Sequence, residues 1–156
     1  MRRLVLGCCV IALVACNKAK EEPPVESTAA APEGPAAPAP IALADIAGKW
    51  SVRTMAETGD SVLITYELVT SSDTSGWSLN FPKRKPIPMR VVAVAGDSIV
   101  TEAGPFESAL RKGVQVSVQN VTRLQDGKMV GTTIAHYATK DADSVRNLRF
   151  EGTRAP

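Results

Sequence analysis

The stretch GKWSVRT, residues 48–54, shows the pattern that decides the fold of this chain. Trp50, Val52 and Thr54 occupy every second position, and polar or charged residues stand between them. Successive side chains of a β-strand point to opposite faces, so a period of two places these three side chains on one face. The stretch therefore predicts a strand with one buried face.

Alternation of this kind recurs through the rest of the chain, whereas helical periodicity is nearly absent. A short helical turn is expected at residues 44–47. The run from Met89 to Ala95 is rich in valine and predicts a strand buried on both faces. Turn sequences separate the runs, and Asp126-Gly127 is a strong hairpin signal. The further predicted strands cover residues 62–68, 77–81, 89–95, 98–102, 114–119, 130–136 and 145–152.

Eight or nine short strands with close turns predict an all-β domain over residues 41–156, about the size of a single domain. A sandwich and an antiparallel up-and-down barrel of about eight strands both fit this spacing. We expect the barrel, because closing the sheet removes the exposed edges that lead to aggregation.

The triplet Gly48-Lys49-Trp50, at the start of the first predicted strand, resembles the G-x-W motif of lipocalins and their calycin relatives. In that family the tryptophan closes one end of the barrel beside an arginine of the last strand, and Arg149 and Arg154 are both candidates for that arginine. The chain departs from lipocalins in lacking a T-D-Y motif, a disulfide and a C-terminal helix. The resemblance implies a small lipocalin-like barrel.

Residues 1–15 have the three zones of an export signal, with Arg2 and Arg3 followed by an apolar run that ends at Ala15. The tetrad LVAC, residues 13–16, resembles a bacterial lipobox, which implies a diacylglycerol-modified Cys16 at the new N-terminus. The alternative is an ordinary secreted protein. Asn17 replaces the aspartate that retains such proteins at the inner membrane. We expect a lipoprotein of the bacterial cell envelope, anchored in the outer membrane and facing the periplasm.

Residues 16–40 combine the modified cysteine with a segment rich in alanine and proline that contains no aromatic residue. A segment of this composition cannot bury enough apolar surface to offset the entropy lost on ordering. It is therefore expected to be a disordered linker between the membrane and the folded domain.

Composition excludes several classes of function. The chain carries a formal net charge of +2, and Arg2 and Arg3 lie in the predicted signal, so the mature chain is neutral and is not expected to bind nucleic acid. Cys8 and Cys9 leave with the signal, which excludes disulfides and cysteine nucleophiles. A single histidine excludes a histidine-rich metal site, and we find neither a nucleophile elbow nor a phosphate-binding loop. We expect no enzyme, cofactor or metal.

Two functional hypotheses remain. In the first, the barrel interior binds a small apolar or amphipathic ligand; in the second, the barrel is filled and docks another envelope protein. The only histidine shares a strand face with Ile134, and a structural role is its alternative interpretation. The expected interior positions are Trp50, Val52, Ile64, Tyr66, Trp77, Leu79, Phe81, Ile134, His136 and Phe150.

The run FPKRKPIP, residues 81–88, places three cations between prolines and predicts an exposed loop. Such a loop either contacts anionic headgroups or an acidic partner, or is a solvated loop that keeps the domain soluble.

Overall fold

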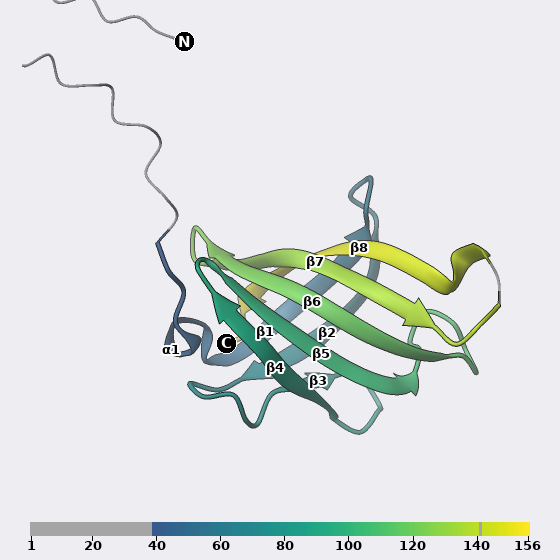
Figure 1. The fold of residues 1–156 in the computed structure, drawn as a ribbon, viewed down its shortest axis with the longest axis horizontal. Helices are drawn as coiled ribbons and strands as arrows, with labels where there is room; N and C mark the ends of the chain where they lie inside the picture. Colours follow the sequence, from purple (N-terminus) through teal and green to yellow (C-terminus); the bar gives the residue numbers. More distant parts are fainter. Residues whose placement is uncertain (1–38, 141) are drawn as a thin grey trace, which may run out of the picture. The chain divides into compact units, whose positions relative to one another are not determined.

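The computed structural model describes residues 39–140 and 142–156. The predicted signal, Cys16 and linker residues 17–38 lie outside this part of the chain, whereas Ala39 and Pro40 lead directly into the domain. The predicted all-β fold is confirmed: eight antiparallel strands form a closed barrel in chain order (Figure 1). The elements are α1 (Leu43–Ile46), β1 (Gly48–Ala56), β2 (Val62–Thr70), β3 (Ser78–Asn80), β4 (Ile87–Ala95), β5 (Ser98–Glu107), β6 (Gln115–Gln125), β7 (Lys128–Tyr137), the 3₁₀ turn η1 (Ala142–Ser144) and β8 (Val145–Arg154).

Each strand pairs with the next one in the chain, and β8 pairs with β1 to close the barrel. The β6–β7 hairpin turns at the predicted Asp126-Gly127 pair, where both residues have positive φ angles of 51° and 73°. Two such residues form the turn whose twist matches that of the flanking strands. The resulting architecture is an up-and-down meander, consistent with the lipocalin-like resemblance.

The two ends of the barrel differ. We call the end covered by α1 the capped end; β1 begins there, and the C-terminus lies beside it (Figure 1). The opposite end, which we call the open end, carries the connections at residues 57–61, 81–86 and 108–114, and residues 138–140 together with η1.

The apolar core falls into two clusters that follow these ends. The larger cluster lies toward the capped end and the smaller one toward the open end. The larger contains Ile46, Trp50, Val52, Leu68, Trp77, Leu79, Met89, Ile99, Ala103, Met129 and Phe150. The smaller contains Val116, Ala135, Tyr137 and Leu148.

The prediction that β4 is buried on both faces is wrong. Val92 and Val94 have exposed fractions of 45% and 44%, and the register with β5 shifts between Val91 and Ala93. β3 is only three residues long and pairs with the first residues of β4, so among the described residues no strand covers the far edge of β4 from Arg90 onward. Valine content alone did not distinguish a doubly buried strand from one whose neighbour ends early.

Candidate ligand site at the open end of the barrel

A cavity lies inside the barrel toward the open end. It offers about 60 Å³ to the centre of a water-sized sphere and communicates with solvent. The side chains around it come from seven of the eight strands and from the β3–β4 and β5–β6 connections. The lining comprises Thr54, Ile64, Tyr66, Leu79, Phe81, Phe106, Ser108, Ala109, Leu110, Val116, Val118, Asn120, Thr133, Ala135, Tyr137 and Leu148.

One wall of the cavity is aromatic. The Tyr66 and Phe81 ring centroids are 5.0 Å apart, and those of Phe81 and Phe106 are 6.2 Å apart, both in tilted arrangements. Tilted pairs at such distances are favourable because ring edges meet ring faces. These rings give the cavity a rigid apolar surface.

The opposite wall carries buried polar groups. The Thr133 hydroxyl donates to Asn120 Oδ1 at 2.7 Å, and the Asn120 amide donates to Thr101 Oγ1 at 3.3 Å. Thr101, Asn120 and Thr133 are all buried. On the aromatic side of the cavity, burial raises the pKa of Tyr66 to about 12, and a hydrogen bond to Thr54 acts in the opposite direction. The cavity is thus amphipathic, with neutral hydrogen-bonding groups on one side and apolar rings on the other.

The connection between β5 and β6 folds over the mouth of the cavity. The buried Ser108 hydroxyl accepts hydrogen bonds from the backbone N–H groups of Leu110 and Arg111, each at 3.0 Å. The Ser108 N–H donates to the Val114 carbonyl at 2.8 Å. Leu110 packs against the smaller core cluster and lines the cavity. Hydrogen bonds and an apolar anchor therefore hold this loop in one conformation.

One arginine contacts this loop and another belongs to it. Arg84 donates to the carbonyl oxygens of Glu107 at 2.6 Å and Ser108 at 3.3 Å. The Arg111 guanidinium lies over the ring of Tyr137, 4.2 Å from its centroid, and Tyr137 lines the cavity. A cation over an aromatic face is stabilised by the ring quadrupole. The mouth of the cavity is thus bordered by positive charge.

The predicted exposed loop of cations lies at this same end. Lys83, Arg84 and Lys85 are all exposed, as expected, and the guanidinium of Arg84 also turns back onto the barrel backbone. Only the two lysines of the run therefore extend freely into solvent.

At the capped end, the predicted tryptophan is fully buried. Trp50 Nε1 donates to the Ile46 carbonyl at 2.8 Å, and the Arg154 guanidinium lies 4.5 Å from the centroid of the indole ring. Arg154 also donates to the carbonyls of Ala47 at 2.8 Å and Asp45 at 2.7 Å. Of the two candidate arginines, Arg154 is the partner of the tryptophan.

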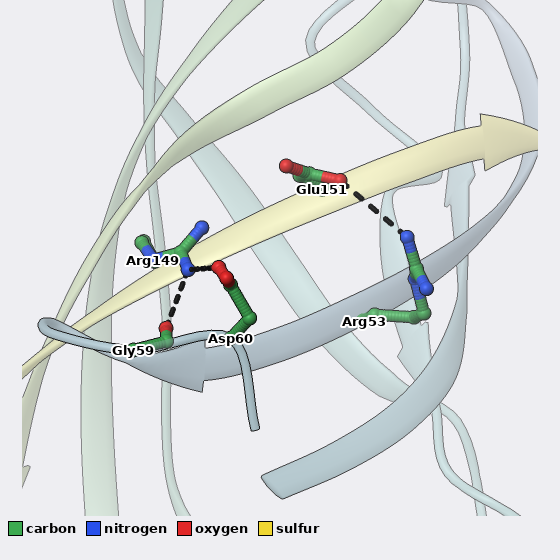
Figure 2. A network of polar contacts seen from close by, with 5 residues as sticks. All are labelled: Arg53, Gly59, Asp60, Arg149 and Glu151. Atoms are coloured by element: carbon green, nitrogen blue, oxygen red, sulfur yellow. Dashed lines mark hydrogen bonds and ion pairs between the residues drawn. The ribbon is translucent and has the colours of Figure 1, made fainter. Parts of the chain in front are cut away.

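Arg149 has a different role (Figure 2). It contacts the Gly59 carbonyl and the Asp60 carboxylate, which ties the β1–β2 hairpin to β8. On the same outer surface, Arg53 and Glu151 are paired across β1 and β8 at 3.5 Å. These exposed pairs contribute little to stability and mainly orient the hairpin.

The ten expected interior positions divide into three groups. Ile64, Tyr66, Leu79 and Phe81 line the cavity. Trp50, Val52, Trp77 and Phe150 belong to the solid core toward the capped end. Ile134 and His136 face outward, so the prediction that they point into the barrel is wrong.

The error in β7 has a simple physical reason. Its two faces are equally mixed, since Val130, Thr132, Ile134 and His136 alternate with Met129, Gly131, Thr133, Ala135 and Tyr137. Neither face is clearly apolar, so the pattern does not select one. The register set by the Asp126-Gly127 hairpin turns Thr133, Ala135 and Tyr137 inward.

Sequence reasoning also missed Phe106, Leu110, Asn120, Thr133 and Tyr137 as lining residues. Phe106 follows a register shift after Ala103, so alternation counted from Ser98 does not locate it. Leu110 lies in a connection, where strand periodicity says nothing. Asn120 continues the inward face of Val116 and Val118, and that continuation was the one available signal.

His136 lies beside a depression of about 460 Å³ on the outer surface, next to the register shift in β5. Glu102 is paired there with Arg90 at 2.6 Å and accepts from the Gln119 amide at 3.2 Å. Ser117, opposite His136 on β6, also contributes to the depression. The histidine is thus separate from the barrel cavity.

Within residues 39–140 and 142–156, no three His, Cys, Asp or Glu side chains are grouped so as to hold a metal ion. The described part of the chain contains no helix with the length and apolarity needed to cross a bilayer. Comparison with models of protein families, with curated protein sequences and with solved structures found no match in any of the three.

Proposed function

We propose that this protein is a lipid-anchored binding protein of the bacterial envelope whose barrel takes a small amphipathic ligand at its open end. The observation that carries the proposal is the cavity itself. An aromatic wall faces buried hydroxyl and amide groups, and the space communicates with solvent in a barrel whose other end is filled. Such a combination of apolar walls and few polar groups is typical of small-molecule sites.

The size of the cavity limits the ligand. Sites for drug-sized molecules enclose roughly 300–1,000 Å³, whereas this cavity offers about 60 Å³. A guest of a few atoms, or the short apolar end of a larger molecule, fits without rearrangement. We therefore propose binding rather than catalysis, since the lining groups are neutral and no nucleophile and base stand together among them.

A cavity-filling variant tests the binding site. Ala135 is buried and lines the cavity, so Ala135→Leu places a larger side chain in the space that the ligand needs. Titrating ¹⁵N-labelled protein with hexanol and hexanoate should shift the backbone signals of lining residues saturably in the wild type and not in the variant. Ala93→Leu adds the same atoms on the exposed surface of β4 and serves as the matched control. Equal binding by wild type and Ala135→Leu would contradict the site.

The lipid anchor is a separate part of the proposal and rests on the sequence at residues 13–16. Two or three acyl chains anchor a protein stably, whereas one chain binds only marginally. Expression in a bacterium should place the wild type in the detergent phase after phase partitioning. Cys16→Ser should move it to the aqueous phase or leave it uncleaved, and an unchanged distribution would exclude lipidation at this cysteine.

The second hypothesis, a module that docks another envelope protein, is favoured by one specific observation. The far edge of β4 exposes Val92 and Val94, and among the described residues no strand pairs with it. Exposed edges of this kind bind extended segments of other chains by adding a strand. Val92→Lys should abolish such docking without affecting the binding of small molecules, which separates the two hypotheses.

A further inference from the structure

The open end of the barrel carries more cations than carboxylates. Its four connections and the adjoining strand ends contribute both kinds of residue. The cations of the open end are Lys83, Arg84, Lys85, Arg111, Lys112, Lys140, Arg146 and Arg149. Its carboxylates among the described residues are Glu57, Asp60, Glu107 and Asp143. A rim of one predominant sign attracts ligands of the opposite charge.

Arg111 is the cation best placed to contact a ligand in the cavity. It directly follows Leu110, which lines the cavity, and its guanidinium lies on the ring of Tyr137, which also lines it. The side chain is only 21% exposed, so packing holds it in place. Its carboxylate partner is Asp143, at 3.6 Å, whose side chain is 75% exposed. A pair with one member in water is weak, and a ligand anion can replace it.

The cavity sets the length of the apolar part. A single water molecule requires about 10–15 Å³ of sphere-filled volume, and the centre of a sphere of that size can move over about 60 Å³ here, so the cavity has the size of on the order of four to six such groups. A methylene group is about as large as a water molecule. A straight tail of four to six carbons therefore fills the space, and further carbons must remain outside or displace side chains.

We infer that the ligand is a short-chain amphiphile with an anionic headgroup, whose head pairs with Arg111 and whose tail occupies the cavity between the aromatic wall and Asn120. This inference rests on the proposed binding function and adds the charge of the head and the length of the tail. The anionic head and the short tail are inferred together, because Arg111 and the cavity meet at the same loop.

The experiment compares two homologous series on the ¹⁵N-labelled full chain: the carboxylates from butanoate to dodecanoate, and the straight-chain alcohols of the same lengths. The carboxylate should bind about fivefold more tightly than the alcohol at low salt, which is the upper range for a partly exposed ion pair. The difference should shrink at 0.5 M salt, where the screening length is roughly 4–5 Å. Each added methylene should tighten binding about fourfold until the tail reaches four to six carbons.

Arg111→Gln should reduce the preference for the carboxylate over the alcohol from about fivefold to none, and Arg111→Lys should restore most of this preference. Lys128→Gln makes the same change in net charge at the capped end and should have no effect. Thermal unfolding of each variant verifies that the domain remains folded.

Equal affinities for carboxylate and alcohol, or an unchanged preference in Arg111→Gln, would overturn the role of the cation while leaving the proposed binding function in place. A fourfold gain per methylene that continues to dodecanoate would overturn the tail length. Failure of both series to bind would refute the proposed function itself, and the inference with it.

Discussion

Trp50 provides the most direct test of how the barrel is closed. Its side chain has no exposed surface, its indole N–H donates to the Ile46 carbonyl at 2.8 Å, and Arg154 covers its ring. Replacing a buried tryptophan with alanine commonly costs about 3–5 kcal/mol through lost burial and the remaining cavity. Trp50→Ala should therefore lower the free energy of unfolding by about 4 kcal/mol.

Trp50→Phe separates the hydrogen bond from the burial. The Ile46 carbonyl still accepts from the Thr70 hydroxyl, so it is not left without a partner. The loss should then be only about 1–2 kcal/mol, the sum of one hydrogen bond and a modest loss of volume. The expected order is wild type, Trp50→Phe, Trp50→Ala.

Urea unfolding of the full chain, followed by circular dichroism, measures these differences. With a denaturant slope of about 2 kcal/mol/M, a loss of 4 kcal/mol shifts the midpoint by about 2 M. Val94→Ala, at an exposed position of β4, is the control and should change the stability by less than about 0.5 kcal/mol. A loss below about 1.5 kcal/mol for Trp50→Ala would refute the view that this side chain closes the barrel.

Two further predictions concern the strands around the cavity. Burial raises the pKa of Tyr66 to about 12, so the folded chain retains a proton that the unfolded chain loses near pH 10. The contribution of the protonated Tyr66 to the free energy of unfolding is complete below pH 10 and is lost between pH 10 and 12. Because Tyr66 borders a cavity open to water, we expect this loss to be about 1–2 kcal/mol. Urea unfolding of wild type and Tyr66→Phe at pH 8 and pH 11.5 measures it. A Cβ at Gly131 would collide with the Val121 carbonyl oxygen and the Phe150 ring. Gly131→Ala should therefore cost about 3 kcal/mol in urea unfolding, and a neutral effect would contradict the packing of β7 against β8.

The β4 edge and the cavity mouth represent two different ways in which this barrel can bind a partner. The edge offers backbone groups and two valines, whereas the mouth offers an amphipathic space beside a guanidinium. A substitution at Val92 affects the edge without the mouth, and a substitution at Arg111 affects the mouth without the edge. The two kinds of binding can therefore be tested separately.

Local patterns in the sequence were sufficient for the fold class. Alternation at Trp50, Val52 and Thr54 and the Asp126-Gly127 turn are properties of adjacent residues, and the structure confirms the strands and the hairpin. The triplet at residues 48–50 likewise placed the tryptophan at one end of a barrel, which is the capped end in the structure. The predicted lipid anchor and linker are also local signals, and they stay predictions because they lie outside the described residues.

The site depended on tertiary structure. Four of the expected interior residues line the cavity, but the sequence could not distinguish them from Trp50 or Phe150, because alternation reports the face of a strand and not the depth along the barrel. It could not orient β7, whose faces are equally mixed, nor place Leu110 and Arg111 over the mouth. It also left the choice between Arg149 and Arg154 open, because only the pairing of β8 with β1 brings Arg154 opposite Trp50. Contacts between residues far apart in the chain are set by strand register and barrel closure, and these are properties of the whole fold.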